Sequence, residues 1–141
     1  MKNKLINWVA VASILLLINN YDAKSQITVT VGSITSGYYN VTNQYPAAYT
    51  RYHESTRQQI LISASEMSSA GAIAGQITAL GFDVYNPNTC GPLPNYTIKM
   101  KQTTATSIST IDNTGLTQVY TTSSYTPVTG WNIHTFSTSF T

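Results

Sequence analysis

The chain has very few charged residues, and this scarcity excludes several kinds of partner. Charged residues occupy 9% of the 141 positions, where about a quarter is usual in soluble domains. The formal net charge of +2 comes from Lys2, Lys4, Lys24 and Asp22, and the rest of the chain is neutral. A neutral domain does not attract phosphate backbones or anionic membranes. We therefore do not expect nucleic acid as a partner.

Cysteine pairs and clusters of metal ligands are also missing. Cys90 is the only cysteine, so the chain has no internal disulfide framework, and its thiol is either buried or pairs with a group outside this sequence. The two histidines, His53 and His134, lie far apart, and no C-x-x-C or H-x-x-x-H spacing occurs. Metal sites need three or four converging ligands, often at short spacings. We expect neither a metal ion nor a cofactor.

Catalytic motifs are equally scarce. The sequence has no G-x-S-x-G nucleophile turn. A glycosidase needs two carboxylates on either side of a sugar bond, and beyond the N-terminal segment the candidates are Glu54, Glu66, Asp83 and Asp112. Glu66 is explained as a helix cap and Asp112 as part of a turn, and nothing supports a pair of Glu54 with Asp83. We predict that the protein is not an enzyme.

One long apolar run is present, and it lies at the N-terminus. Lys2 and Lys4 precede the apolar stretch 5–18, and the polar residues 19–22 end it. This run is shorter than the roughly 20 residues of a membrane-spanning helix, and a basic start with a short apolar core is typical of a secretory signal peptide. Small residues at Ala23 and Ser25 predict cleavage before Gln26. The sequence thus predicts a signal peptide at 1–25, a mature domain at 26–141 without a membrane span, and a secreted or cell-surface location.

The mature part is rich in Ser, Thr and Tyr, which favour half-buried strands when they alternate with apolar residues. The alternation predicts short strands at 27–31, 57–63, 76–84, 96–101, 117–121 and 131–136. The residues expected to face the core are Leu80, Phe82, Val84, Tyr96, Ile98, Met100, Trp131 and Ile133. Gly81 is interpreted as a possible bulge. Short strands between Gly, Pro and Asn turns indicate an all-β fold, a sandwich or jelly roll, with a closed barrel as the alternative.

A single short helix is predicted after the second of these strands. Ser63 and Glu66 have the spacing of a capping box, in which the hydroxyl and the carboxylate bond to each other's backbone N–H groups. Gly71 supplies a left-handed stop. The helix is therefore expected to have one or two turns, near 65–70.

Three stretches of the mature chain carry a resemblance to a known module. They are 64–84 (Ala-Ser-Glu-Met through Gly-Phe-Asp-Val), 95–100 (Asn-Tyr-Thr-Ile-Lys-Met) and 119–132, which ends in Thr-Gly-Trp-Asn. They resemble a module of large secreted and cell-surface proteins of Bacteroidetes-type bacteria, often found ahead of a type IX secretion sorting domain. The resemblance covers about 27–140 and implies a strand-rich fold and an extracellular location, without catalytic residues.

The same resemblance implies that the chain is truncated at its C-terminal end. In that family the Trp-containing strand is followed by a Trp-Asp-Gly turn and a further apolar strand, whereas this sequence ends at Thr141. A sheet that lacks a strand exposes an edge that pairs with other chains. We therefore expect the chain to be marginally stable, and extension by the native continuation to stabilise it and to offer Cys90 a disulfide partner.

The most polar cluster lies in a region without apolar period. Arg51, Tyr52, His53 and Glu54 follow Tyr49, and together these five residues are the predicted ligand-binding patch. Other tyrosines of this region, at positions 38, 39 and 45, have the side chains that stack on sugars or pack in protein interfaces. The competing interpretations are a solvated loop for 51–54 and loop-filling packing for the tyrosines.

We predict a non-catalytic extracellular module that serves adhesion or spacing within a larger secreted protein. The alternative is a carbohydrate-binding accessory module of a secreted hydrolase. The expected partner is accordingly a surface protein or a glycan.

Overall fold

The computed structural model describes residues 26–32, 48–50 and 55–141, in which the chain forms one short helix and four strands. The elements are α2 (Ala64–Ser69), β1 (Ile77–Val84), β2 (Leu93–Met100), β3 (Thr117–Tyr125) and β4 (Gly130–Phe140). The prediction of a strand-rich chain with a single short helix is confirmed for this part of the protein. The predicted signal peptide lies outside the described residues.

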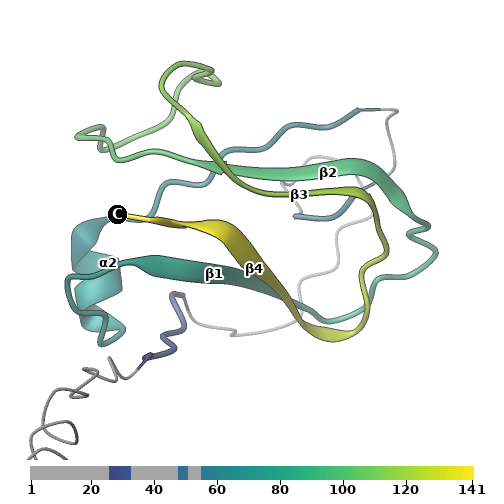
Figure 1. The fold of residues 1–141 in the computed structure, drawn as a ribbon, viewed down its shortest axis with the longest axis horizontal. Helices are drawn as coiled ribbons and strands as arrows, with labels where there is room; N and C mark the ends of the chain where they lie inside the picture. Colours follow the sequence, from purple (N-terminus) through teal and green to yellow (C-terminus); the bar gives the residue numbers. More distant parts are fainter. Residues whose placement is uncertain (1–25, 33–47, 51–54) are drawn as a thin grey trace, which may run out of the picture.

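The strands form two antiparallel pairs, β1 with β4 and β2 with β3 (Figure 1). The inner faces of the two pairs share a hydrophobic core around Ile98 of β2, Val119 of β3 and Phe136 of β4. Partly buried side chains from all four strands pack against this core: Ile77, Leu80, Tyr96, Met100, Tyr120 and Phe140. Each pair therefore has one face toward the other pair and one face toward solvent.

The helix α2 forms where the capping signal predicts it. The Ser63 hydroxyl accepts a hydrogen bond from the Glu66 N–H, and the Ser63 N–H donates to the Glu66 carboxylate. At the other end Gly71 has a φ of 89°. This conformation lets the Ala72 N–H donate to the Met67 carbonyl and the Gly71 N–H donate to the Ser68 carbonyl. This pattern is a Schellman motif, and it limits the helix to six residues.

The predicted alternation is confirmed along β2 and β1. Ile98 is buried and Tyr96 and Met100 are partly buried, whereas Thr97 and Lys99 are exposed. On β1 the side chains of Leu80 and Phe82 likewise lie on the inner face, because they pair with buried residues of β4. The prediction of a bulge at Gly81 is wrong, since the register shifts between Ile77 and Ala79 instead.

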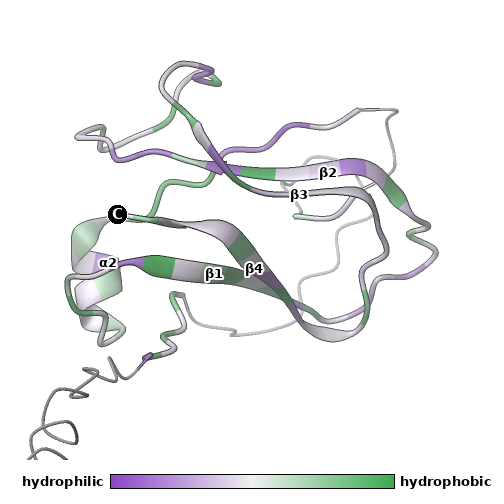
Figure 2. Cartoon of the chain, viewed as in Figure 1, coloured by the Kyte–Doolittle hydropathy of each residue, from purple (hydrophilic) through white to green (hydrophobic). Residues whose placement is uncertain are grey.

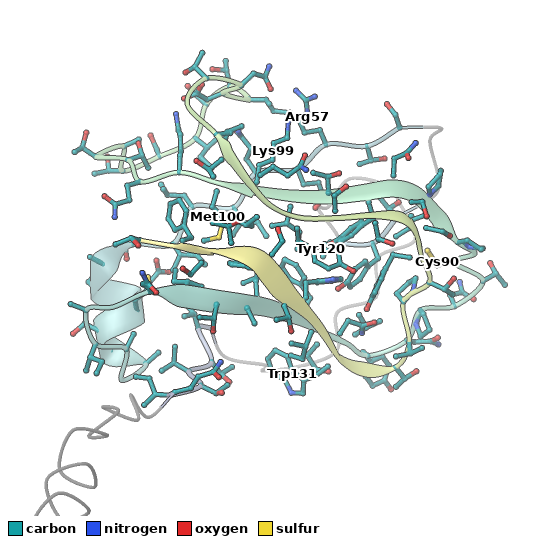
Figure 3. All side chains as sticks on the ribbon, viewed as in Figure 1. Arg57, Cys90, Lys99, Met100, Tyr120 and Trp131 are labelled. Atoms are coloured by element: carbon teal, nitrogen blue, oxygen red, sulfur yellow. The ribbon has the colours of Figure 1, made fainter. Side chains whose placement is uncertain are left out.

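The predicted orientation of β4 is also wrong. Trp131 and Ile133, expected in the core, are 51% and 57% exposed, whereas Asn132, His134 and Phe136 are buried. Figure 3 shows Trp131 on the side of β4 that faces away from β2 and β3, and Tyr120 between the two pairs. Because side chains alternate along a strand, one buried residue fixes the orientation of its neighbours. The inner and outer faces of β4 are therefore the reverse of those predicted.

Two further predicted strands do not form. Residues 27–31 and 57–63 have no strand assignment, and Ile60 is 61% exposed. The second segment is held by side chains instead: the Gln59 amide bonds to both backbone groups of Asp112, and Arg57 donates to the Asn113 side chain. These polar contacts with the 103–115 loop replace the expected backbone ladder.

Hydrophobic residues are scattered along the four strands, separated by paler and more polar stretches (Figure 2). The core is consequently small, with Leu93, Ile98, Val119 and Phe136 as its buried apolar residues in the described ranges. None of the helices described has the length and apolar character needed to cross a membrane.

Candidate functional site

The inner face of β4 owes its orientation to Asn132, whose side chain is 2% exposed. Its Oδ1 accepts hydrogen bonds from the Tyr125 hydroxyl and the Val128 N–H, both at 2.9 Å. Its Nδ2 donates to the carbonyls of Val128 and Gly130, at 2.7 and 2.8 Å. These four bonds use the full capacity of the amide, so Asn132 is buried with every polar atom satisfied and fastens the turn between β3 and β4.

Two residues further along β4, His134 is fully buried, with 0% exposure, among aromatic rings. The ring centroids of Tyr125, Tyr120 and Tyr96 lie 4.6, 4.7 and 5.1 Å from that of His134. The Tyr49 hydroxyl and His134 Nε2 share a hydrogen bond of 2.6 Å. The imidazole is thus surrounded by tyrosines from β2, β3 and the 48–50 segment.

The protonation states of this tyrosine cluster follow from its burial. Burial lowers the pKa of His134, and its Nδ1 is buried without a hydrogen-bond partner in the described part of the chain. A protonated imidazole has two N–H donors, and Nδ1 would find no acceptor among these residues, so the surroundings favour the neutral form of His134. Burial also raises the pKa of Tyr96 to about 12 and that of Tyr49 well above its usual value, and the nearby Tyr125 contributes to both increases.

The outer face of the β1–β4 pair has the opposite character. Gly81 lies directly across from Ile133, and Asp83 lies across from Trp131. A Cβ atom added to Gly81 would lie 2.5 Å from Ile133 Cδ1 and 3.3 Å from Trp131 Cε3. The two β4 side chains therefore lean over the glycine, and they form a continuous apolar surface that we call the Trp131 platform (Trp131, Ile133 and Gly81).

Polar groups border the Trp131 platform. Asp83 is exposed beside Trp131, and Thr135 is exposed two residues beyond Ile133 on the same face. Both are hydrogen-bonding groups, and Asp83 is the only charged residue on β1 and β4. The platform is therefore apolar in its centre, and its border carries a single negative charge.

The predicted ligand-binding residues are only partly within the described chain. Tyr49 is half-buried, and its hydroxyl is engaged with His134, with its ring stacked on Tyr125 at 5.5 Å between centroids. Arg51, Tyr52, His53 and Glu54 lie outside the described residues. Tyr49 thus packs in the tyrosine cluster, and the ligand role of all five residues stays a prediction.

Two other acidic residues of the described chain, Glu66 and Asp112, have the structural roles that the sequence indicated. The Ser63 N–H holds the pKa of Glu66 below its usual value at the start of α2. Asp112 accepts bonds from the backbone N–H and hydroxyl of Thr114, and the Lys101 ammonium beside it holds its pKa well below the usual range. Over the ranges that the structure describes, no three His, Cys, Asp or Glu residues come together as a metal site.

Cys90 lies half-buried in the loop between β1 and β2, with its thiol 3.7 Å from the Gly91 carbonyl oxygen. Its backbone N–H donates to the Pro87 carbonyl. These contacts place the thiol at the end of the β1–β4 pair where the β3–β4 turn also lies (Figure 3). They do not test whether Cys90 has a partner outside this sequence.

Hydropathy could not have identified either the tyrosine cluster or the Trp131 platform. The run from Trp131 to Phe136 offers two alternating sets, Trp-Ile-Thr and Asn-His-Phe, and hydropathy favours burial of the first. The available signals were the high tyrosine content, ten residues in all, and an Asn two residues after a Thr-Gly turn. An Asn at that position is placed to bond to turn carbonyls.

Comparison of the chain with protein-family models, with curated proteins and with solved structures found no match. The resemblance to a module of Bacteroidetes-type surface proteins therefore remains a prediction from the sequence.

Proposed function

We propose that this chain is a non-catalytic module of an exported or cell-surface protein and that it serves adhesion. The observation that carries the proposal is the exposed pair Trp131 and Ile133 on the solvent face of β4. Large apolar side chains that are contiguous and exposed mark interaction sites more often than isolated ones do, and aromatic residues are enriched where proteins bind partners.

The rest of the described chain supports a binding role for this face. We interpret the two antiparallel pairs as the halves of a β-sandwich. In this arrangement β4 buries Asn132 and His134 on its inner face and leaves Trp131 and Ile133 on its outer face. A module that served only as a spacer would gain nothing from this exposure, which costs solubility. Adhesion is therefore favoured over spacing, and the predicted signal peptide at 1–25 would deliver the module to the outside of the cell.

A bead-adhesion assay tests the proposal. The full chain would be exported from a bacterial host, recovered and coated on beads, and bead retention under flow would be measured on mucin, on polysaccharide gels and on fibronectin. We expect retention above that of albumin-coated beads on at least one surface. The double variant Trp131→Ala, Ile133→Ser should reduce this retention to the albumin level.

The matched control is Tyr85→Ala, which removes an aromatic side chain that is 78% exposed in the loop after β1. Tyr85 lies outside the platform, so this variant should be retained like the wild type. Wild-type beads that adhere no better than albumin on all three surfaces would contradict the proposal.

A further inference from the structure

We propose that the Trp131 platform is a saccharide-binding site, in which the indole of Trp131 stacks on the apolar face of a neutral sugar ring and Asp83 accepts hydrogen bonds from its hydroxyls. This inference rests on the proposed adhesion function and names the ligand class. It concerns described residues of β1 and β4 only.

The flatness of the platform is the first argument. Gly81 is the one position across from Ile133, and any side chain there would meet Ile133 Cδ1 at 2.5 Å. Because glycine has no side chain, the side chains of Trp131 and Ile133 occupy the space above Gly81 and lie close to the β1 backbone. A flat apolar surface of this kind matches the C–H face of a pyranose, which is also flat and apolar.

The border of the platform is the second argument. A sugar ring carries hydroxyls around its edge, and a ligand of this shape needs hydrogen-bond acceptors and donors beside the stacking surface. The exposed Asp83 carboxylate, directly across from Trp131, and the Thr135 hydroxyl occupy such positions. Since Asp83 is the only charge on the two strands, an acidic sugar would be repelled and a neutral one is preferred.

The size of the platform is the third argument, and it separates a saccharide from a protein partner. A stable protein interface buries about 800 Å² on each side and involves about 20–30 residues per partner. The platform offers two large side chains and a glycine, which is the scale of one or two sugar rings. A second copy of this chain would therefore find too little apolar surface here to form a stable dimer.

Tryptophan fluorescence reports directly on this site. Trp8 and Trp131 are the two tryptophans of the sequence, and the predicted cleavage before Gln26 removes Trp8. The exported chain, with its processing checked by intact mass, would be titrated with cellohexaose, chitohexaose, mannohexaose and, as the acidic contrast, hexagalacturonate. We expect at least one neutral probe to change the Trp131 emission with saturation, and the acidic probe to leave it unchanged.

Calorimetric titration of variants with the same probe gives the decisive comparison. Trp131→Ala should weaken binding at least about tenfold, because the stacking surface is lost. Gly81→Val should weaken binding severalfold, because the valine side chain would displace Ile133 and Trp131 and make the surface uneven. Tyr85→Ala, the exposed aromatic control, should bind like the wild type. Circular dichroism of each variant verifies that the strands are retained.

Three results would overturn the inference. They are saturation by none of the neutral probes, binding that survives Trp131→Ala, or a wild-type dimer in sedimentation that Trp131→Ala converts to monomer. The last result would make the platform a self-association surface. Wild-type beads that adhere while no saccharide binds would leave the adhesion function standing and remove only the saccharide.

Discussion

The two faces of the β1–β4 pair are built on opposite principles. The inner face places an amide and an imidazole, Asn132 and His134, among aromatic rings, and both are at most 2% exposed. The outer face places an indole and an isoleucine in water, each about half exposed or more. A rule that buries the most apolar side chains of a strand would place Trp131 and Ile133 inside and Asn132 and His134 outside.

Hydrogen-bond capacity, and not hydropathy alone, decides which face of this strand is buried. Burying an unsatisfied amide costs about 1–3 kcal/mol or more, yet Asn132 loses nothing because all four of its bonds are made inside. His134 is satisfied only in part: the Tyr49 hydroxyl shares a hydrogen bond with Nε2, and the other tyrosines contribute ring contacts, since a tyrosine side chain is apolar along the ring and polar at the tip. Four predictions, from the largest expected effect to the smallest, test this comparison.

The inner face should be most sensitive at Asn132. Asn132→Leu keeps the size of the side chain but leaves the Tyr125 hydroxyl and the backbone groups of Val128 and Gly130 without their partner, so we expect a loss of about 3 kcal/mol in unfolding free energy. Urea unfolding followed by circular dichroism measures it. Gln118→Ala, an exposed amide on β3, is the control and should change stability by less than about 0.5 kcal/mol. Equal effects of the two variants would contradict the role of Asn132.

The buried imidazole should make the fold acid-sensitive. The folded pKa of His134 lies below the ordinary value near 6.5, so the unfolded chain takes up the proton first as the pH falls. Stability is therefore complete above about pH 6.5 and decreases below it, by at most about 1.4 kcal/mol per pH unit, until the folded pKa is reached. Urea unfolding between pH 5 and 7.5 measures the slope.

The variant His134→Phe provides the control for this slope. It retains an aromatic ring in the tyrosine cluster, and the phenylalanine side chain that replaces the imidazole does not titrate. We expect its stability to be almost independent of pH in this window, where the pKa values of Glu66 and Asp112 are too low to matter. A wild type without the slope would show that His134 titrates normally.

The hydroxyl that reaches His134 should contribute less. Tyr49→Phe keeps the ring contacts and leaves Nε2 of His134 without its partner, so we expect a loss of about 1–2 kcal/mol. The comparison is Tyr120→Phe, another ring of the cluster at 4.7 Å from His134 but one whose hydroxyl does not bond to the imidazole. If both variants lose the same stability, the Tyr49–His134 bond contributes nothing specific.

The outer face should be the least sensitive. Ile133→Ser removes an apolar side chain that is already 57% exposed, so we expect less than about 0.5 kcal/mol of change in stability. Thermal unfolding measures it, beside Phe136→Ala on the buried side of the same strand, which should lose about 3 kcal/mol or more. A large loss for Ile133→Ser would mean that this side chain is covered in solution.

Local signals in the sequence were sufficient for much of the fold. The capping box at Ser63 and Glu66 and the glycine at 71 predicted α2, because caps involve only residues within a few positions. The alternation at Tyr96, Ile98 and Met100 predicted the buried face of β2, because only one of its two alternating sets is apolar. The same reasoning failed at 27–31 and 57–63, since a strand forms only where another strand offers a ladder.

Local patterns in the chain were therefore enough to predict the strand-rich class, the short helix and its ends, and the inward face of β2, all of which depend on neighbouring residues. Three features became visible only in the folded protein: which side of β4 is buried, the contact of Tyr49 with His134, and the regular pairing of Gly81, which is not a bulge. The contacts of Tyr49 with His134 and of Gly81 with Ile133 join residues far apart in the sequence, so local patterns do not reveal them. The four bonds of Asn132 reach only nearby residues, but hydropathy does not register that they satisfy a buried amide. Because side chains alternate along a strand, burial of Asn132 and His134 turns their apolar neighbours toward solvent.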